Sequence, residues 1–505
     1  MSDSTTFDII IVGSGPAGCV LASRLSEEPN RRVLLIEAGP DYGGYPADWP
    51  QELLDSSTIP TESHPWGFRH VPREEAAELG LPRGRVVGGT STINGCIWLR
   101  GSAADYDSWA AAGNPGWTFA ELHELFLGAE SDPLGGDLHG LGGPVPVHRV
   151  SEAALTPIDQ LLIESAMRLG IPFVDDLNGE TAQRPGIGPT PKNVKDGSRM
   201  NGALTYLAPV RDRENLTILS NRLVDVVTTQ EGRATGVQLA DGDFLAANEV
   251  ILSAGAYGSP AILMRSGIGP VSHLNRLGIP VVRDLPGVGQ NLRDHPMVGF
   301  GNVKIAETHT PAGRTFMPII IKGRSEQAED EVDFHIYQGQ SLDDPEIGWT
   351  LWLSISLQDA RSVGTVKLSS RDPEAELLID HRYFSEPRDL EAMCDGLELA
   401  RRLVDTAPLG AVVTNVDRQT ASWTSRTELR RYAHSSVGTT FHPSSTCKMG
   451  PEIDPTAVVD HQGRVHGVQS LRVVDASIFP TGPRCNLHFP IVVAAEKIAR
   501  DIQRG

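Results

Sequence analysis

Two apolar runs near the start of the chain flank a segment with helical spacing. Residues 9–12 are uninterrupted β-branched side chains, which is typical of a strand buried on both faces, and residues 32–36 form a second, mainly apolar run. Between them a helix is predicted to begin at Pro16. Its apolar residues can face the strands: Val20, Leu21 and Leu25. The pattern therefore predicts a βαβ unit.

Later runs predict that the chain returns to the same sheet. Residues 216–219 and 249–254 are apolar runs of strand length, and residues 223–227 form another. A last helix is expected over residues 490–502, with Pro490 at its first position. The apolar face of this helix would be Ile491, Ala494, Ala495 and Ile498.

Residues 303–437 show a different pattern, in which apolar and polar positions alternate. Such alternation is typical of antiparallel strands with one covered face. It is clearest in three segments: residues 332–337, 350–355 and 364–368. A helix is predicted over residues 387–406, and another runs from Thr156 as cap and Pro157 to Leu169. The fold class is therefore α/β, with a second lobe built on a mainly antiparallel sheet.

The length of 505 residues is too great for one hydrophobic core, so two domains are expected. The first is predicted to be discontinuous and the second to lie between its pieces. The predicted bounds are 1–150, 205–300 and 439–505 for the first domain, and 151–204 and 301–438 for the second. Residues 40–72, rich in Asp, Pro and Gly, are expected to form a long ordered excursion over the first domain.

Charge and cysteine content narrow the range of partners. The net charge of −20 argues against nucleic acid and against an anionic membrane surface. No apolar run is long enough for a membrane span, and residues 1–6 lack the features of a signal peptide. The five scattered cysteines suggest neither a disulfide framework nor a zinc site. We therefore expect a cytoplasmic protein without a bound metal, as a monomer or a homodimer.

The turn after the first strand has a spacing that is typical of nucleotide binding. Gly13 allows a tight turn, Gly15 lets backbone N–H groups approach a pyrophosphate, and Gly18 lets helix and strand pack closely. The helix N-terminus adds partial positive charge for the phosphates. Glu37 ends the second strand, where it can accept hydrogen bonds from the ribose hydroxyls of an adenosine. These features favour a dinucleotide and leave both NAD and FAD open.

A second glycine-rich stretch covers residues 83–101. Gly88 and Gly89 are followed there by small hydroxyl residues and Asn94. Such a loop lets the backbone pass close to a flat ligand while it offers hydrogen-bond donors.

This stretch resembles the first signature of the glucose-methanol-choline (GMC) flavoprotein oxidoreductases. Residues 255–270 resemble the second signature, and the resemblance runs from Asp8 to Arg500. It implies FAD as the cofactor and the GMC fold, with a Rossmann-like FAD-binding domain beside a substrate lobe. Ile93 stands where some members tether the flavin through a histidine, so the FAD is expected to be non-covalent.

The resemblance also implies which residues contact FAD. Val224 is carried over by position as a backbone contact to the adenine, and Asp475 with Ala476 as a contact after a C-terminal strand. The full predicted set is Gly13, Ser14, Gly15, Pro16, Ala17, Gly18, Glu37, Ala38, Val87, Gly89, Thr90, Ser91, Asn94, Gly95, Cys96, Ile97, Val224, Asp475, Ala476, His488, Phe489 and Pro490.

Two C-terminal histidines are the candidates for catalysis. Oxidation of an alcohol needs a base for the hydroxyl proton, and a neutral imidazole suits this task. The resemblance implies that His442 is the base and His488 the partner that binds the alcohol oxygen. Members often have Asn at the second place, and Asn486 is the alternative if the register slips. Ser445 stands where the family often shows Gly, so the turn there is expected to be posed differently.

The remaining histidines are weighed by the same reasoning. A single histidine is structural more often than not. We interpret these as structural: His139, His295, His434, His461 and His466.

The resemblance thus implies FAD-dependent oxidation of a primary or secondary alcohol to the carbonyl. Hydride would pass to flavin N5, and O2 would reoxidise the flavin. Residues 133–144 and the overall length resemble bacterial members that act on small aromatic alcohols. The alternatives are a dehydrogenase that uses a quinone or protein acceptor, a lyase of the hydroxynitrile type, and a non-enzymatic flavoprotein.

Overall fold

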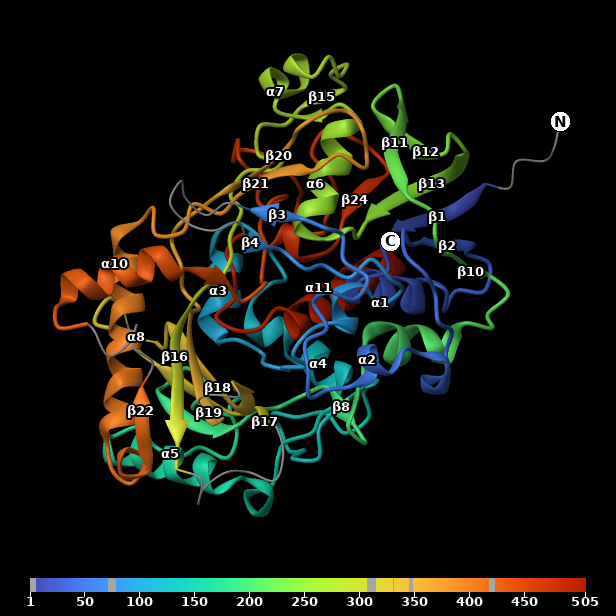
Figure 1. Ribbon diagram of the computed structural model, residues 1–505. Helices are drawn as coiled ribbons and strands as arrows, with labels where there is room; N and C mark the ends of the chain where they lie inside the picture. Colours follow the sequence, from blue (N-terminus) through green and yellow to red (C-terminus); the bar gives the residue numbers. More distant parts are fainter. Residues whose placement is uncertain (1–5, 71–78, 307–314, 330, 345–347, 417–422) are drawn as a thin grey trace.

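Two large sheets, each with its own helices, make up the protein (Figure 1). The computed structural model describes residues 6–505 apart from residues 71–78, 307–314, 330, 345–347 and 417–422. Residues 1–5, and residues 71–72 at the end of the predicted excursion, therefore lie outside the described residues. In Figure 1 the first sheet lies at the upper right and the second at the lower left, with the C-terminal helix α11 near the centre.

The first sheet confirms the predicted βαβ unit and its return strands. Its strand order is β10-β2-β1-β13-β12-β11, and β24 also pairs with β13. Strands β10, β2, β1, β13 and β24 run parallel, whereas β11 and β12 form an antiparallel hairpin. The bounds are β1 (Phe7–Val12), β2 (Val33–Ile36), β10 (Leu216–Leu219), β11 (Val224–Gln230), β12 (Arg233–Leu239), β13 (Phe244–Leu252) and β24 (Leu471–Val473).

Helices α1 (Pro16–Leu25) and α11 (His488–Arg504) pack against each other beside this sheet. A Cβ on Gly18 would lie 1.9 Å from the carbonyl oxygen of Gly13, so only glycine permits this approach of helix to strand. Helix α11 begins two residues earlier than we predicted. Pro490 is tolerated within its first turn, because the N–H groups there have no intrahelical acceptor.

The second sheet is antiparallel, as the alternating pattern predicts. Its order is β22-β16-β19-β18-β17-β7, with β23 paired to β16. Helix α8 (Pro387–Asp405) packs on it, and α5 (Pro157–Arg168) begins with a capping box between Thr156 and Asp159. The bounds are β7 (Gly186–Pro189), β16 (Pro296–Ile305), β17 (Thr315–Gly323), β18 (Phe334–Asp344), β19 (Gly348–Leu357), β22 (Val413–Val416) and β23 (Gly438–Thr439).

The remaining elements are short. The segment around residues 364–368 is an antiparallel strand, β20 (Thr365–Leu368), but it pairs only with β21 (Leu377–Asp380), outside the large sheet. The others are α2 (Gln51–Leu54), α3 (Ala103–Ala111), α4 (Phe119–Ala129), α6 (Gly255–Arg265), α7 (Val271–Arg276), α10 (Arg426–Ser436), β3 (Arg69–His70), β4 (Leu79–Gly80), β5 (Glu130–Ser131), β6 (Val145–Pro146), β8 (Val194–Lys195), β9 (Ser198–Arg199), β14 (Ile268–Gly269) and β15 (Arg283–Asp284).

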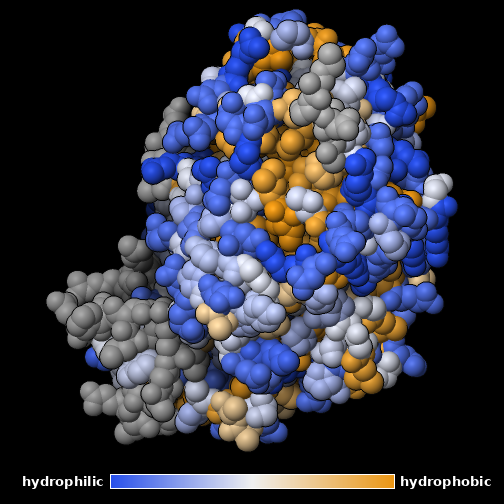
Figure 2. Space-filling view, turned by 90° about the vertical axis from the view of Figure 1, so that its right-hand side faces the viewer, coloured by the Kyte–Doolittle hydropathy of each residue, from blue (hydrophilic) through white to orange (hydrophobic). Residues whose placement is uncertain are grey.

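Each large sheet has its own hydrophobic core. One core gathers side chains of β1, β2, β13, α1 and α11, and the other those of β16, β18, β19, α5 and α8. This division supports the two predicted domains, whose bounds stay a prediction. The face seen in Figure 2 is mostly hydrophilic, with hydrophobic side chains gathered in one area of its upper half. Within the described residues, no helix has the length and apolar character needed to cross a membrane.

All five cysteines are buried and unpaired, as the scattered spacing suggests. Burial raises the pKa of each thiol. The thiols therefore stay protonated at neutral pH, which fits a packing role rather than a chemical one.

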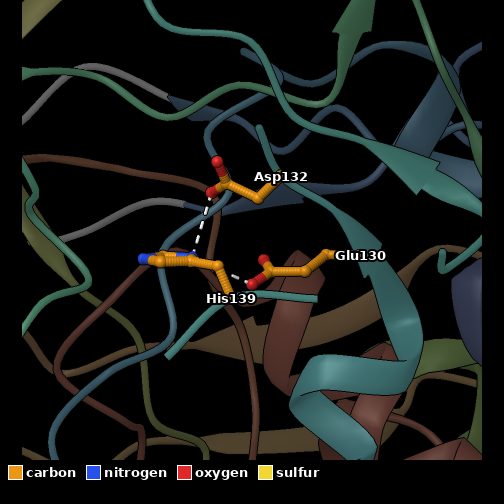
Figure 3. A group of neighbouring side chains, drawn as sticks. All are labelled: Glu130, Asp132 and His139. Carbon is orange, nitrogen blue, oxygen red and sulfur yellow. Dashed lines mark hydrogen bonds and ion pairs between the residues drawn. The ribbon is translucent and has the colours of Figure 1, made fainter. Parts of the chain in front are cut away.

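An ionic network centred on His139 joins the loop after α4 to the segment before β7. His139 Nδ1 lies 3.1 Å from Glu130 and 3.0 Å from Asp132, and Figure 3 shows the ring between these two carboxyl groups. Its Nε2 lies 2.8 Å from Asp176. Arg149 contacts both oxygens of Asp132 at 2.7 Å and reaches Asp176 at 3.2 Å.

Arg100 completes this network with a contact of 3.3 Å to Glu130. Three carboxylates thus face two guanidinium groups, and the charges balance only if His139 is protonated. Burial alone would lower the pKa of His139, but hydrogen bonds to the carboxylates of Asp132, Asp176 and Glu130 outweigh it and raise the pKa to about 10. Glu130, Asp132 and His139 lie close enough together to hold a metal ion, but the carboxylates of Glu130 and Asp132 are already in contact with Arg100 and Arg149.

We predict that this network makes stability depend on pH. The folded-state pKa of His139 lies above the usual value of 6.5, so its stabilisation is complete below that value and is lost as pH rises toward about 10. Replacing His139 by Gln leaves the carboxylates in excess and should cost roughly 3–5 kcal/mol at neutral pH. The measurement is the thermal midpoint of the FAD-loaded protein from pH 6 to pH 10, roughly the range over which the group titrates.

The exposed His148 gives a matched control, because His148→Gln removes a histidine outside this network. The difference in midpoint between the parent and His139→Gln should shrink as pH rises, while His148→Gln follows the parent. An equal difference at all pH values would contradict a protonated His139.

Candidate active site

A cavity of about 610 Å³ is lined by strands of both large sheets and by the loops next to them. It is lined by the turn after β1, the end of β2, the loop that contains Gly89, the start of α6, and segments of β16, β17, β18 and β19. The C-terminal residues 440–443 and 486–488 complete the wall. The cavity thus brings the two glycine-rich motifs and both candidate histidines to one site.

The two glycine motifs form a cradle that side chains would fill. Gly13 has a φ of +96° and Gly89 a φ of +54°, in the left-handed region that favours glycine. A Cβ on Gly89 would lie 2.6 Å from the Cα of Gly15, whereas the corresponding position on Gly15 faces open space. The N-terminus of α1 follows directly at Pro16. This arrangement fits the pyrophosphate of a dinucleotide such as FAD.

Glu37 lies at the end of β2 with 5% of its surface exposed. Its carboxylate accepts hydrogen bonds from the N–H and the hydroxyl of Ser14 at 2.9 and 2.8 Å, and from the N–H of Gly39 at 3.2 Å. Burial raises the pKa of Glu37, and the bonds from Ser14 oppose this. Lone pairs remain for ribose hydroxyls, since Glu37 also lines the cavity.

Most of the predicted cofactor residues line this cavity. They are Gly13, Gly15, Pro16, Ala17, Glu37, Ala38, Gly89, Thr90, Ser91, Asn94, Gly95, Ile97, Val224, Asp475, Ala476 and His488. The others are buried and do not line it: Ser14, Gly18, Val87, Cys96, Phe489 and Pro490. Ser14 holds Glu37, and Phe489 stacks on Trp98 with ring centroids 4.2 Å apart. Ile93, which lines the cavity, has no atom that could bond covalently to a flavin.

Asp475 fastens the C-terminal segment to the start of α6. Its carboxylate accepts from the N–H of Gly255 at 2.9 Å and from the hydroxyl of Ser259 at 2.5 Å. The turn at Ser445 is joined to the same place, because its N–H donates to the carbonyl of Ala476 at 3.0 Å. Ser445 has a φ of +73°, so it adopts the left-handed conformation that glycine would favour there. The serine therefore keeps the glycine-type turn.

His442 lies in the wall with both ring nitrogens in contact. Its Nδ1 is 2.9 Å from Nδ1 of His295, and its Nε2 is 3.2 Å from the amide nitrogen of Asn486. The side-chain oxygen of Asn486 accepts from the Tyr337 hydroxyl at 3.3 Å. The alternative residue Asn486, rather than His488, thus contacts His442.

His488 occupies a different place, as the first residue of α11. Its Nδ1 lies 3.4 Å from the amide nitrogen of Asn94, and its ring meets Trp98 edge to face at 5.0 Å. Both His488 and Asn94 line the cavity. The two-residue offset from Asn486 points the two side chains to different neighbours.

The Asp294 carboxylate holds the backbone around His442. One oxygen accepts from the N–H groups of His295 at 2.8 Å and of His442 at 2.9 Å. The other accepts from the hydroxyls of Tyr383 at 2.6 Å and Thr439 at 2.5 Å. On the cavity side, Arg83 donates to the carbonyl of Phe441 at 2.8 Å.

The electrostatics of the site keep the histidines uncharged. Burial, together with His295 and Arg83, lowers the pKa of His442 well below its usual value. Burial also lowers the pKa of His488 to about 4 and that of His295 to about 4. Neutral imidazoles can accept a proton at physiological pH, which is the state that a general base requires.

Several residues of the cavity were not in the predicted set. They include Arg83, Met297, Met317, Tyr337, Trp352 and Phe441. Arg83 belongs to the glycine-rich stretch of residues 83–101, and Tyr337 and Trp352 belong to two of the alternating segments. Alternation does not tell which face of a strand meets a ligand. His295, which we interpreted as structural, contacts His442 directly, and no local signal indicated this.

Family models match most of the chain. Two models described as GMC oxidoreductase match residues 7–297 and residues 360–495. The mitochondrial choline dehydrogenase of Mus musculus is 35% identical, with 100% of this chain and 90% of that protein covered. The oxygen-dependent choline dehydrogenase of Photobacterium profundum is 33% identical, with 98% of this chain and 93% of that protein covered.

Solved structures give the same picture. Pyridoxine 4-oxidase from Mesorbium loti has a TM-score of 0.89 and 31% identity, with 99% of this chain and 100% of that chain covered. Formate oxidase of Aspergillus oryzae RIB40 has a TM-score of 0.88 and 26% identity, with 100% and 99% covered. The chain is therefore a member of the GMC oxidoreductase family, an FAD-dependent enzyme that acts on CH–OH donors.

Proposed function

We propose that this enzyme oxidises small, uncharged primary or secondary alcohols, aromatic ones in particular, and that O2 reoxidises its FAD. The observation that carries the proposal is the neutral imidazole of His442 in an aromatic-lined cavity. The glycine cradle, Glu37, Val224 and Asp475 would hold the FAD, which would accept the hydride from the substrate carbon.

The roles of the side chains follow from their contacts. An alcohol oxygen that replaced the direct contact between His442 Nε2 and the Asn486 amide would give its proton to the imidazole and accept a hydrogen bond from the amide. The Tyr337 hydroxyl orients that amide by its hydrogen bond to the side-chain oxygen of Asn486. We therefore assign the base to His442 and the oxygen-binding role to Asn486 in place of His488.

The lining near these residues favours an apolar substrate. Ile97 and Tyr337 belong to one hydrophobic cluster with Met317 and Trp352, and all four line the cavity. Flat rings and soft thioethers make favourable contacts with an aromatic ligand.

Charge argues against a cationic substrate such as choline. Among the described residues, Arg83 brings a positive charge to the cavity near His442, and the neighbouring carboxylate of Asp294 is already bonded and lies outside the lining. Of the carboxylates that do line it, Glu37 and Asp475 are bound to backbone N–H groups at the nucleotide cradle, and Glu374 and Glu376 are exposed side chains in the segment between β20 and β21. A cation buried beside His442 would therefore meet Arg83 and no buried carboxylate that is free to pair with it among the described residues, and an unpaired buried charge is costly.

The proposal for O2 rests on the relatives. Solved structures of similar fold are named as pyridoxine 4-oxidase and formate oxidase, and several relatives as oxygen-dependent choline dehydrogenases. A quinone or protein acceptor remains the alternative.

The first prediction concerns the substrate. Under anaerobic conditions, benzyl alcohol and pyridine methanols should bleach the flavin absorbance, while choline should do so at least about tenfold more slowly at equal concentration, because the site offers it no counter-charge. If O2 is the acceptor, admission of air should restore the absorbance of the oxidised flavin at least as fast as the enzyme turns over. Faster bleaching by choline would overturn the assignment of a neutral substrate, and consumption of a cyanohydrin with the flavin still oxidised would favour the lyase.

The second prediction concerns the base. His442 is an effective base only when neutral, and its lowered pKa means that it loses its proton well below pH 6.5. The value of kcat/KM should therefore be flat above that pH and fall only on acidification. His442→Gln should lower kcat by roughly 10²–10⁴-fold and abolish the acid limb, while the FAD absorbance is retained. An acid limb that survives in this variant would assign the base to another group.

The third prediction separates Asn486 from His488. Asn486→Ala removes the amide that would hold the alcohol oxygen, so kcat/KM should fall by roughly tenfold to a hundredfold. His488→Ala should cause a smaller fall, because its ring contacts Asn94 and Trp98 instead of His442. Steady-state rates with the best alcohol, normalised to FAD content, check both. A larger loss in His488→Ala would restore the original assignment.

A further inference from the structure

Hydrogen bonds join Tyr337, Asn486, His442 and His295 in a row along the cavity wall, and each residue donates to the next. In the structure the side-chain oxygen of Asn486 faces the Tyr337 hydroxyl at 3.3 Å, and its amide nitrogen faces Nε2 of His442 at 3.2 Å. Whereas a flipped amide would accept from a protonated Nε2, in this orientation the amide nitrogen donates and Nε2 is the unprotonated nitrogen. The proton of a neutral His442 is left on Nδ1.

His295 accepts a hydrogen bond from the Nδ1–H group of His442. Its Nδ1 lies 2.9 Å from Nδ1 of His442, with the two rings nearly perpendicular at 89°. Two Nδ1 atoms in contact need one donor and one acceptor, so His295 accepts and carries its own proton on Nε2. The backbone of Gln358 and of Pro483 interacts with the His295 ring and favours the presence of a ring proton.

The distance between the two rings is fixed by the backbone. A single oxygen of Asp294 accepts from the N–H groups of both His295 and His442. His295 is 3% exposed and does not line the cavity, so it reaches a substrate only through His442. The charged or titratable groups that face the pair are Asp294, Arg83 and His335.

We propose that His295 is a positioning residue that holds His442 in the Nδ1–H tautomer and thereby keeps Nε2 unprotonated, so that it can accept the alcohol proton. This inference rests on the proposed role of His442 as the base. In the other tautomer Nε2 would already carry a proton and could not act. Because His295 is neutral, it offers no negative charge to a protonated His442. The His442 imidazolium therefore gives up its proton readily after the reaction.

A direct test is nitrogen NMR on FAD-loaded protein labelled at histidine, with the His442 signals assigned by their absence in His442→Gln. The nitrogen shifts of the parent should show a protonated Nδ1 and a bare Nε2 for His442. The His295→Leu variant, which has no acceptor, should lose this pattern, and His295→Asn should keep it, because its oxygen takes the place of Nδ1. A parent His442 protonated at Nε2 would overturn the proposal.

Kinetics give a second readout on the same variants. His295→Leu should lower kcat by roughly 10²-fold with KM changed by less than about threefold, and His295→Asn should recover kcat to within about tenfold of the parent. His273→Gln, at a buried histidine within α7, is the control for loss of a histidine elsewhere. If His295→Leu binds FAD and retains the parent kcat, the proposal fails.

Failure of the proposed alcohol oxidation itself would instead appear as a flavin that no alcohol reduces, with the NMR result unaffected.

Discussion

The three residues of β24 join the end of the chain to the sheet that begins with β1. They pair in parallel with β13, Leu471 beside Val250 and Val473 beside Leu252. Asp475 then bonds to the start of α6, so the segment that leaves the sheet is held at both ends. This pairing and the packing of α11 on α1 hold the C-terminal histidine segment and the glycine cradle in one frame. The site is therefore a product of tertiary pairing between the two ends of the sequence.

The sequence predicted those features whose causes are local. A strand, a glycine turn, a helix and a second strand follow one another within the first forty residues or so, and hydrophobic periodicity with glycine spacing indicates all of them. His442 could be found because Pro443 and the surrounding residues form a recognisable motif. The fold of the second lobe followed from alternation in the strands that became β18 and β19.

The features that were missed depend on contacts between distant segments. Asn486 and His488 lie two residues apart at the start of α11, and periodicity cannot resolve which of them contacts His442. His295 meets His442 because Asp294 collects N–H groups from both segments, which no local pattern reveals. The strand β20 has the alternation of a sheet strand, but it pairs with the nearby β21 in a two-stranded sheet, and alternation does not tell which partner a strand takes.

The histidines illustrate how surroundings determine charge. His139 and His442 are both largely buried, yet carboxylates raise the pKa of the first while burial and a nearby guanidinium lower that of the second. In the network of His139, three anions and three cations share one enclosed volume. Evolutionary drift at any of these positions alone would break neutrality. The network therefore couples the loop after α4 to the segment before β7, so that a change of charge in one is felt by the ionic groups of the other.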